Sequence, residues 1–208
     1  MIVARIQAHP SREVLHDRLT ALLQPLPTEL LVHESDPPDP WANYKQCLDY
    51  RGDASHILVV QDDAIPVLGF SDAVGQVAER WPDTPVCLFM GAYPSSTAAR
   101  VRRAKPDVRY VALGPSSFMP LVCVLWPTHV ARSFLVWSST ARGMTRADDG
   151  NAARWMKATR TQVMVTVPSL VQHDDGEPSV KGGRSHVPWQ EGWRQALFLA
   201  DDAFRYDW

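Results

Sequence analysis

Apolar and polar residues alternate over residues 1–7, and this period of two is typical of a half-buried strand. From Ser11 the period changes, because apolar residues then recur at intervals of three and four up to Pro25, as on one face of a helix. These two periods predict alternating elements over the first half of the chain: strands at 1–7, 29–33, 56–61 and 85–90, and helices at 11–25, 41–50 and 66–80. Such an alternation favours a mostly parallel sheet with helices on both faces.

Beyond residue 93 the pattern is less regular. Further elements are predicted there: strands at 109–113, 121–126 and 162–167, and helices at 128–139 and 148–158. The length of 208 residues and the apolar content of 45% suit one packed domain. We therefore expect a single α/β domain with a mostly parallel central sheet. Residues 1–93 would form its regular half, 94–182 a less regular half, and 183–208 a C-terminal tail or helix.

The predicted strand at 56–61 is apolar on both faces and ends on Asp62 and Asp63. Other Asp-Asp pairs occur at 148–149, 174–175 and 201–202. The position of the pair is therefore more informative than the dipeptide. In parallel sheets, ligands bind beyond the carboxyl ends of the strands, where the strand order reverses. Two carboxylates at that edge could bind a divalent cation such as Mg²⁺ or Mn²⁺, or could cap the following turn through backbone N–H groups.

Several common signatures of nucleotide binding and hydrolysis are missing. After the first predicted strand, residues 9–12 are HPSR, without the Gly-x-Gly-x-x-Gly of dinucleotide-binding domains. The chain also lacks a Walker sequence and the Gly-x-Ser-x-Gly of α/β-hydrolases. If this fold binds a nucleotide, it does so through residues other than these Gly-rich and Walker motifs.

Charge and cysteine content narrow the classes of partner. The net charge of −2 gives no overall attraction to nucleic acid or to anionic membranes. One basic cluster lacks the interleaved aromatic residues that stack on bases: Arg100, Arg102, Arg103 and Lys105. Three widely spaced cysteines match neither a disulfide framework nor a zinc motif, and no apolar run suits a signal peptide or a membrane span. We expect a soluble, cytoplasmic protein with no nucleic-acid partner and no membrane span.

Three segments together resemble a known family: SHILVVQDDA (55–64), ADDGNAARWM (147–156) and TVPSLVQHDDGEPSV (166–180). The chain resembles a GT-A glycosyltransferase and is most similar to the small family-2-like and family-25-like enzymes of bacteria and tailed phages. The resemblance covers roughly residues 1–182. It implies a GT-A-like domain that binds a nucleotide-sugar donor in its first half and a protein or glycan acceptor in its second half. For a phage-encoded chain, the location would be the host cytoplasm.

The resemblance also implies roles for individual residues. Asp63 would ligate a divalent metal, Mn²⁺ or Mg²⁺, that bridges the donor diphosphate, and His173 would complete the metal site. Asp62 would contact the ribose or the donor sugar. Four further residues fall near the expected donor: Ser11 and Arg12 after the first strand, Asp36 at the end of the second, and Lys181, which could reach the diphosphate or belong to a tail. Gln61 stands where many members of the family have an acidic residue.

Asp148 and Asp149 open a predicted helix, and two interpretations of this pair remain. The family places a carboxylate here that receives the acceptor hydroxyl and acts as the general base in inverting enzymes, a role for which we favour Asp149. Alternatively, the pair stabilises the helix, since negative residues are favourable at a helix N-terminus. The sequence does not distinguish an inverting from a retaining reaction.

Two other functions compete with a metal-dependent glycosyltransferase. A nucleotidyltransferase acting on sugar phosphates also uses strand-end carboxylates and a metal, but HPSR is a poor match to its Gly-rich, basic signature. The other is a non-catalytic nucleotide-sugar-binding protein with a degenerate transferase fold. Only one feature favours it, namely that Gln61 stands where many members of the family have an acidic residue.

Overall fold

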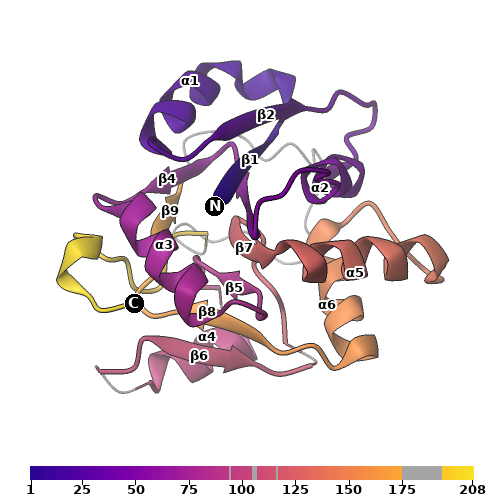
Figure 1. The fold of residues 1–208 in the computed structure, drawn as a ribbon. Helices are drawn as coiled ribbons and strands as arrows, with labels where there is room; N and C mark the ends of the chain where they lie inside the picture. Colours follow the sequence, from indigo (N-terminus) through magenta and orange to yellow (C-terminus); the bar gives the residue numbers. More distant parts are fainter. Residues whose placement is uncertain (94, 105–106, 116, 175–193) are drawn as a thin grey trace.

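The computed structural model describes residues 1–93, 95–104, 107–115, 117–174 and 194–208. At its centre is a seven-stranded sheet in the order β2-β1-β3-β7-β5-β8-β6 (Figure 1). The strands have these bounds: β1 Ile2–Ala8, β2 Thr28–Val32, β3 His56–Gln61, β5 Val86–Cys87, β6 Tyr110–Leu113, β7 Cys123–Pro127 and β8 Val163–Thr166. Within this sheet only β7 and β6 run against the other strands, so the prediction of a mostly parallel sheet is confirmed.

Helices cover both faces of the sheet, as predicted (Figure 1). The described residues form these α-helices: α1 Glu13–Leu22, α2 Pro40–Leu48, α3 Phe70–Arg80, α4 Ser96–Arg102, α5 Thr128–Thr140 and α6 Asp148–Thr159. α1 and α3 pack on one face, and the other four helices pack on the opposite face. β3 serves both cores, because Leu58 and Val60 face α1 and α3 while Ile57 and Val59 face the other side.

A second, two-stranded sheet lies beside α1 and was not predicted. β4 (Ala64–Pro66) pairs antiparallel with β9 (Val171–His173), so that Ala64 stands opposite His173. The predicted helix at 66–80 is therefore wrong in its first turn, because the backbone there bonds to β9. α3 begins only after Gly69, whose φ of 74° is a left-handed conformation that glycine adopts at little cost.

The second half differs from the prediction in two other places. The strand expected at 85–90 is reduced to β5, and the chain beyond it runs beside residues 169–170, where Leu170 N–H donates to Leu88 O at 2.8 Å. The C-terminal helix is not found in residues 194–208, which contain a single 3-10 turn, η2 (Ala203–Arg205). Residues 183–193 lie outside the described part of the chain.

Residues 194–200, called here the C-terminal strap, run along the edge of the sheet where β5 ends. Leu197 N–H donates to Met90 O at 2.7 Å, and Ala92 N–H donates to Gln195 O at 2.9 Å. Farther along, Ala200 N–H donates to Ser169 O at 2.9 Å. The strap is therefore fixed to the same edge of the sheet at which β1 and β3 end.

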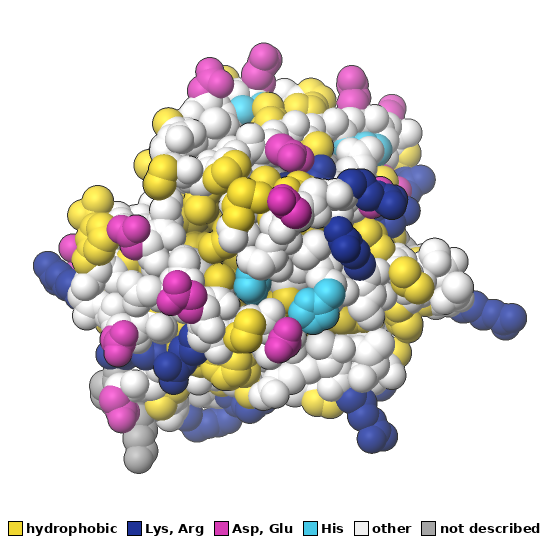
Figure 2. Space-filling view, in the orientation of Figure 1, with side chains coloured by type: hydrophobic (Ala, Val, Ile, Leu, Met, Phe, Trp, Pro, Cys, Tyr) yellow, Lys and Arg dark blue, Asp and Glu magenta, His cyan; other side chains and the backbone are white. Residues whose placement is uncertain are grey.

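The distribution of surface charge and the character of the helices bear on whether the protein could bind a charged partner or cross a membrane. Figure 2 shows acidic and basic side chains interspersed on one face of the molecule, among the described residues. Within the described ranges, no helix combines the length and the apolar character needed to cross a membrane. All three cysteines, Cys47, Cys87 and Cys123, are buried free thiols.

Candidate active site at the end of β3

Asp62 and Asp63 leave the sheet where the strand order reverses. From β1 the chain passes to β2 on one side and then to β3 on the other, and Asp62 N–H donates to Gln7 O of β1 at 3.1 Å. Both carboxylates are nevertheless almost completely buried, with 4% and 3% of their surface exposed. Two adjacent buried carboxylates require positive or hydrogen-bond-donating partners to remain ionised.

Arg12 supplies the first of these partners. The short 3-10 turn η1 (Pro10–Arg12) follows β1 and places Arg12 at the N-cap of α1, with the side chain turned into the protein. One guanidinium nitrogen lies 2.8 Å from Asp62 Oδ1 and 2.5 Å from Asp63 Oδ2. The His9 N–H donates to the second oxygen of Asp62 at 2.8 Å. Arg12 was expected near the donor, and the structure places it as a bridge between the two carboxylates.

His173 reaches Asp63 through the pairing of β4 with β9. Asp63 directly precedes β4, and Asp174 N–H donates to the Asp63 carbonyl at 2.7 Å. His173 Nε2 lies 3.2 Å from Asp63 Oδ2, and both side chains are buried. The structure thus brings together the two residues that the resemblance assigned to a metal.

Arg194, at the start of the C-terminal strap, completes the cluster and was missed by the sequence analysis. Its Nη2 lies 3.3 Å from Asp63 Oδ2 and also contacts His173 Nε2, while its side chain is 30% exposed. Burial alone would raise the pKa of Asp63. The hydrogen bond and charge of His173, with the charges of Arg12 and Arg194, outweigh burial and lower that pKa to about 2. Asp63 is therefore a carboxylate at any physiological pH.

The donor atoms of Asp63 and His173 fit two positions of one metal ion. Carboxylate oxygen and imidazole nitrogen are both ligands of Mn²⁺. Neighbouring ligand atoms of an octahedral ion with bonds of about 2.1 Å lie about 3.0 Å apart, close to the observed 3.2 Å. Asp63 Oδ1 is buried and accepts no hydrogen bond from the described residues. No group of three possible side-chain ligands occurs within the described ranges, so further ligands would come from substrate or water.

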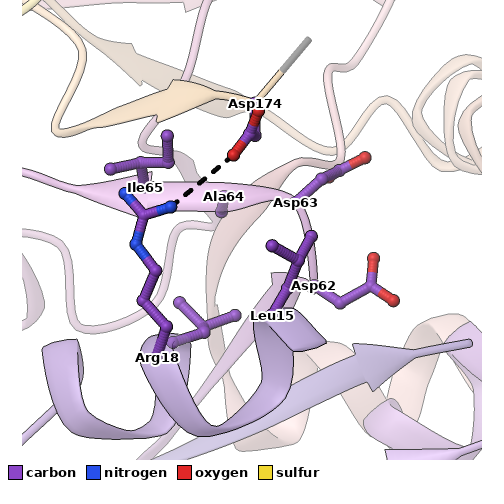
Figure 3. Close-up of a pocket in the computed structure, with 8 residues that line it drawn as sticks. Leu15, Arg18, Asp62, Asp63, Ala64, Ile65 and Asp174 are labelled. Carbon is purple, nitrogen blue, oxygen red and sulfur yellow. Dashed lines mark ion pairs between the residues drawn. The ribbon is translucent and has the colours of Figure 1, made fainter. Parts of the chain in front are cut away.

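A small hollow lies beside the pair, between α1 and β4. It is lined by Leu15, Arg18, Leu19, Asp62, Asp63, Ala64, Ile65 and Asp174. Figure 3 shows Arg18 extending from α1 across β4 to Asp174, with 3.7 Å between guanidinium and carboxylate, while the carboxylates of Asp62 and Asp63 point away from Arg18. Arg18 therefore closes the hollow on one side without neutralising the two strand-end carboxylates.

The other donor-side residues are placed farther out. Ser11 is exposed, and its hydroxyl lies 2.8 Å from His9 Nδ1. Asp36 is exposed in the connection between β2 and α2. Among the described residues, the structure gives neither of them a contact with Asp62 or Asp63. Lys181 lies outside the described residues.

Asp148 and Asp149 have different surroundings, although both lie in the first turn of α6. Asp148 is buried, its Oδ1 accepts from the Asp149 N–H at 2.9 Å, and its Oδ2 accepts from Gln7 Nε2 at 3.3 Å. Gln7 Oε1 accepts in turn from Gln61 Nε2 at 3.3 Å. Asp149 is only half-buried and accepts from the Gly150 N–H at 2.7 Å. Asp148 therefore ties α6 to the ends of β1 and β3, while Asp149 lies closer to solvent.

Replacing Gln7 with leucine should test this link. Gln7→Leu removes the side-chain nitrogen that donates to Asp148 Oδ2 and, at 2.9 Å, to the Pro40 carbonyl, so the free energy of unfolding should fall by about 1–3 kcal/mol. Chemical denaturation measures the change. Gln162→Leu is the matched control, because Gln162 is exposed and its side-chain amide donates a weak hydrogen bond to the sulfur of Met164, at 3.7 Å. Equal stability of the two variants would contradict a structural role for Gln7.

No protein-family model matches the sequence, and no match was found among curated proteins. A solved structure that resembles this one is the crystal structure of A197 from STIV, at 14% identity and a TM-score of 0.42. The match covers 82% of this chain and 83% of that one. At that level the likeness concerns the course of the chain, and no functional statement rests on it.

Proposed function

We propose that this protein is a metal-dependent glycosyltransferase that moves a sugar from a nucleotide-sugar donor to a hydroxyl of a protein or glycan acceptor. One observation supports this proposal above the others. A carboxylate at the end of a central strand, Asp63, lies 3.2 Å from an imidazole contributed by a distant segment, His173. Ligands bind at this edge of α/β sheets, and this pair of groups suits Mn²⁺.

The residues around the pair have separable roles in this proposal. Asp63 and His173 would hold Mn²⁺ or Mg²⁺, and the bound metal would neutralise charge developing on the leaving diphosphate. Arg12 keeps Asp62 and Asp63 in fixed positions through its contacts with both. Carboxylate oxygens accept more than one hydrogen bond, so Asp62 can bond His9 and still accept from a ribose or sugar hydroxyl.

Asp149 is the proposed general base for the acceptor hydroxyl. It is half-buried at the start of α6, whereas Asp148 is buried and bonded to Gln7. A general base must come within hydrogen-bond distance of the acceptor hydroxyl, which enters from solvent. Asp149, the more exposed of the two carboxylates, meets this requirement better than Asp148. Asp148 acts as a positioning residue that fixes the helix start. This assignment applies to an inverting reaction.

Substitution of His173 tests the metal site. In His173→Ala, the affinity for a nucleoside diphosphate in the presence of Mn²⁺ should fall about tenfold or more, while affinity without metal should change little. Calorimetric titrations with UDP, GDP and CDP measure both quantities. His129→Ala is the matched control, because His129 is an exposed histidine paired with Asp83. Unchanged Mn²⁺-dependent affinity in His173→Ala, for a nucleotide that the wild-type protein binds, would refute the metal role.

A non-catalytic nucleotide-sugar-binding protein is the second candidate, and one observation favours it. Arg12 and Arg194 already place two positive charges on Asp63, so the carboxylate does not require a metal to remain ionised. Hydrolysis of a panel of nucleotide-sugars with and without Mn²⁺ separates the candidates. A transferase releases sugar slowly in a metal-dependent way, and a binding protein releases none. A nucleotidyltransferase would instead form a nucleotide-sugar from a sugar phosphate.

A further inference from the structure

We propose that Arg194 is a displaceable internal cation, which occupies the Asp63–His173 pair until a divalent metal and a nucleoside diphosphate replace it together. The proposal rests on the proposed function and adds a control of metal binding to it. It assigns to the C-terminal strap a role that the sequence did not indicate.

The first argument is that Arg194 and a metal need the same space. The Arg194 Nη2 lies 3.3 Å from Asp63 Oδ2 and contacts His173 Nε2 directly. A metal bound to His173 would lie about 2 Å from that same nitrogen. The guanidinium and the metal cannot both occupy this position, and like charges so close would repel strongly. Metal binding therefore requires the side chain of Arg194 to move away.

The second argument is that Arg194 can move while the strap stays in place. The strap is held by its backbone, through bonds between Leu197 and Met90 and between Gln195 and Ala92. Ala196 N–H also donates to Gln172 Oε1 at 2.6 Å. These bonds begin just after Arg194, whose side chain is 30% exposed while Asp63 and His173 are buried. Arg194 is thus more exposed than the two residues that it contacts, and the backbone bonds of the strap do not involve its side chain.

The third argument concerns the balance of charge. With His173 counted as the neutral imidazole that a metal requires, Asp62 and Asp63 contribute two negative charges, and Arg12 and Arg194 contribute two positive ones. Exchange of Arg194 for a divalent cation leaves one excess positive charge in a buried setting, which is unfavourable unless an anion accompanies it. A diphosphate supplies that anion. Metal alone should therefore bind weakly, and metal with nucleoside diphosphate should bind tightly.

The test measures Mn²⁺ binding directly, by the electron paramagnetic resonance signal of free Mn²⁺ and without nucleotide. Arg194→Gln removes the competing charge, so its Mn²⁺ affinity should exceed that of wild type by about twofold to fivefold, within the range of partly exposed charge pairs. Arg205→Gln is the matched control, because Arg205 is an exposed arginine of the C-terminal region paired with Asp201. Its Mn²⁺ affinity should equal that of wild type. Equal or weaker binding in Arg194→Gln would overturn the proposal.

Two further measurements separate the failure of this proposal from that of the proposed function. Asp63→Asn in the Arg194→Gln background should abolish the gain in Mn²⁺ affinity. If Asp63→Asn leaves Mn²⁺ binding intact, the metal site itself is refuted. In the wild-type protein, the NMR signal of the Arg194 side-chain N–H should shift when Mg²⁺ and nucleoside diphosphate are added together, an experiment that does not depend on a variant folding. Mg²⁺-dependent nucleotide binding with an unmoved Arg194 signal would overturn the exchange alone.

Discussion

Asp63→Asn should abolish Mn²⁺-supported nucleotide binding and lower the free energy of unfolding by about 3–5 kcal/mol, the usual range when one partner of a buried ion pair is removed. Asp63 is 3% exposed and contacts Arg12, His173 and Arg194. Loss of its charge leaves Arg12 buried with Asp62 as the remaining carboxylate of the pair. Calorimetry with Mn²⁺ and nucleoside diphosphate measures binding, and urea denaturation measures stability.

The control for this variant is Asp49→Asn. Asp49 is exposed and pairs with Arg51 on the surface. Its replacement removes one negative charge and should change the free energy of unfolding by no more than about 0.5 kcal/mol. Binding should be measured at a temperature at which Asp63→Asn is folded, as checked by circular dichroism. Metal-supported binding that survives in the folded variant would remove Asp63 from the metal site and with it the main support for a transferase.

Asp149→Asn should reduce sugar transfer by about two to four orders of magnitude, the usual range for loss of a general base, while donor affinity stays nearly unchanged. Asparagine keeps the shape of the side chain and can still accept from the Gly150 N–H. Stability should therefore change little. The two quantities are measured on one preparation, transfer by product formation and affinity by calorimetry.

Asp148→Asn provides the comparison, because it shares the first turn of α6. Asp148 is buried and accepts from Gln7, so its replacement should lower stability more than activity per folded molecule. Full activity in Asp149→Asn would leave that residue a helix-capping group. A large loss of transfer in Asp148→Asn alone would move the general base to the buried carboxylate.

The first half of the fold was predictable because its signals are local and long. β3 is a run of apolar, mostly β-branched residues, and a strand covered on both faces needs just that composition. α1 and α2 show the period of a helix, and Asp39 caps α2 by accepting from the Ala42 N–H at 2.9 Å. These features gave the alternation of elements and, with it, the edge of the sheet at which Asp62 and Asp63 emerge.

The rest of the site depends on contacts that leave no local pattern. β4 and β9 have only three residues each, too few for a period to be recognised, yet their pairing places His173 beside Asp63. The sequence pointed to His173 only through the resemblance. Arg194 lies in an irregular segment, and no sequence pattern distinguishes it from the other arginines. Its position beside Asp63 follows from the backbone bonds of the strap, such as the one between Leu197 and Met90.

Gln7 and Gln61 illustrate the same limit within regular strands. Each lies at the end of a correctly predicted strand, and the two stand side by side in the register of β1 and β3. Gln61 donates to Gln7, and the bond from Gln7 to Asp148 depends on where α6 packs, which no pattern in β1 or β3 specifies. Polar residues at strand ends usually face solvent, so the burial of Gln7 could not be inferred from its position alone.

The pairing of β4 with β9 also determines when, during folding, the site can exist. β1, α1 and β3 form from neighbouring segments of the chain, but the contact between Ala64 and His173 closes a loop that contains most of the second half of the protein. Closing a loop of this length has an entropic cost that the local contacts of β1 and α1 do not have. A chain that has completed only its first three strands holds both carboxylates and Arg12 but lacks the imidazole. Competence to bind a ligand at this edge therefore requires the second half of the chain as well as the first three strands.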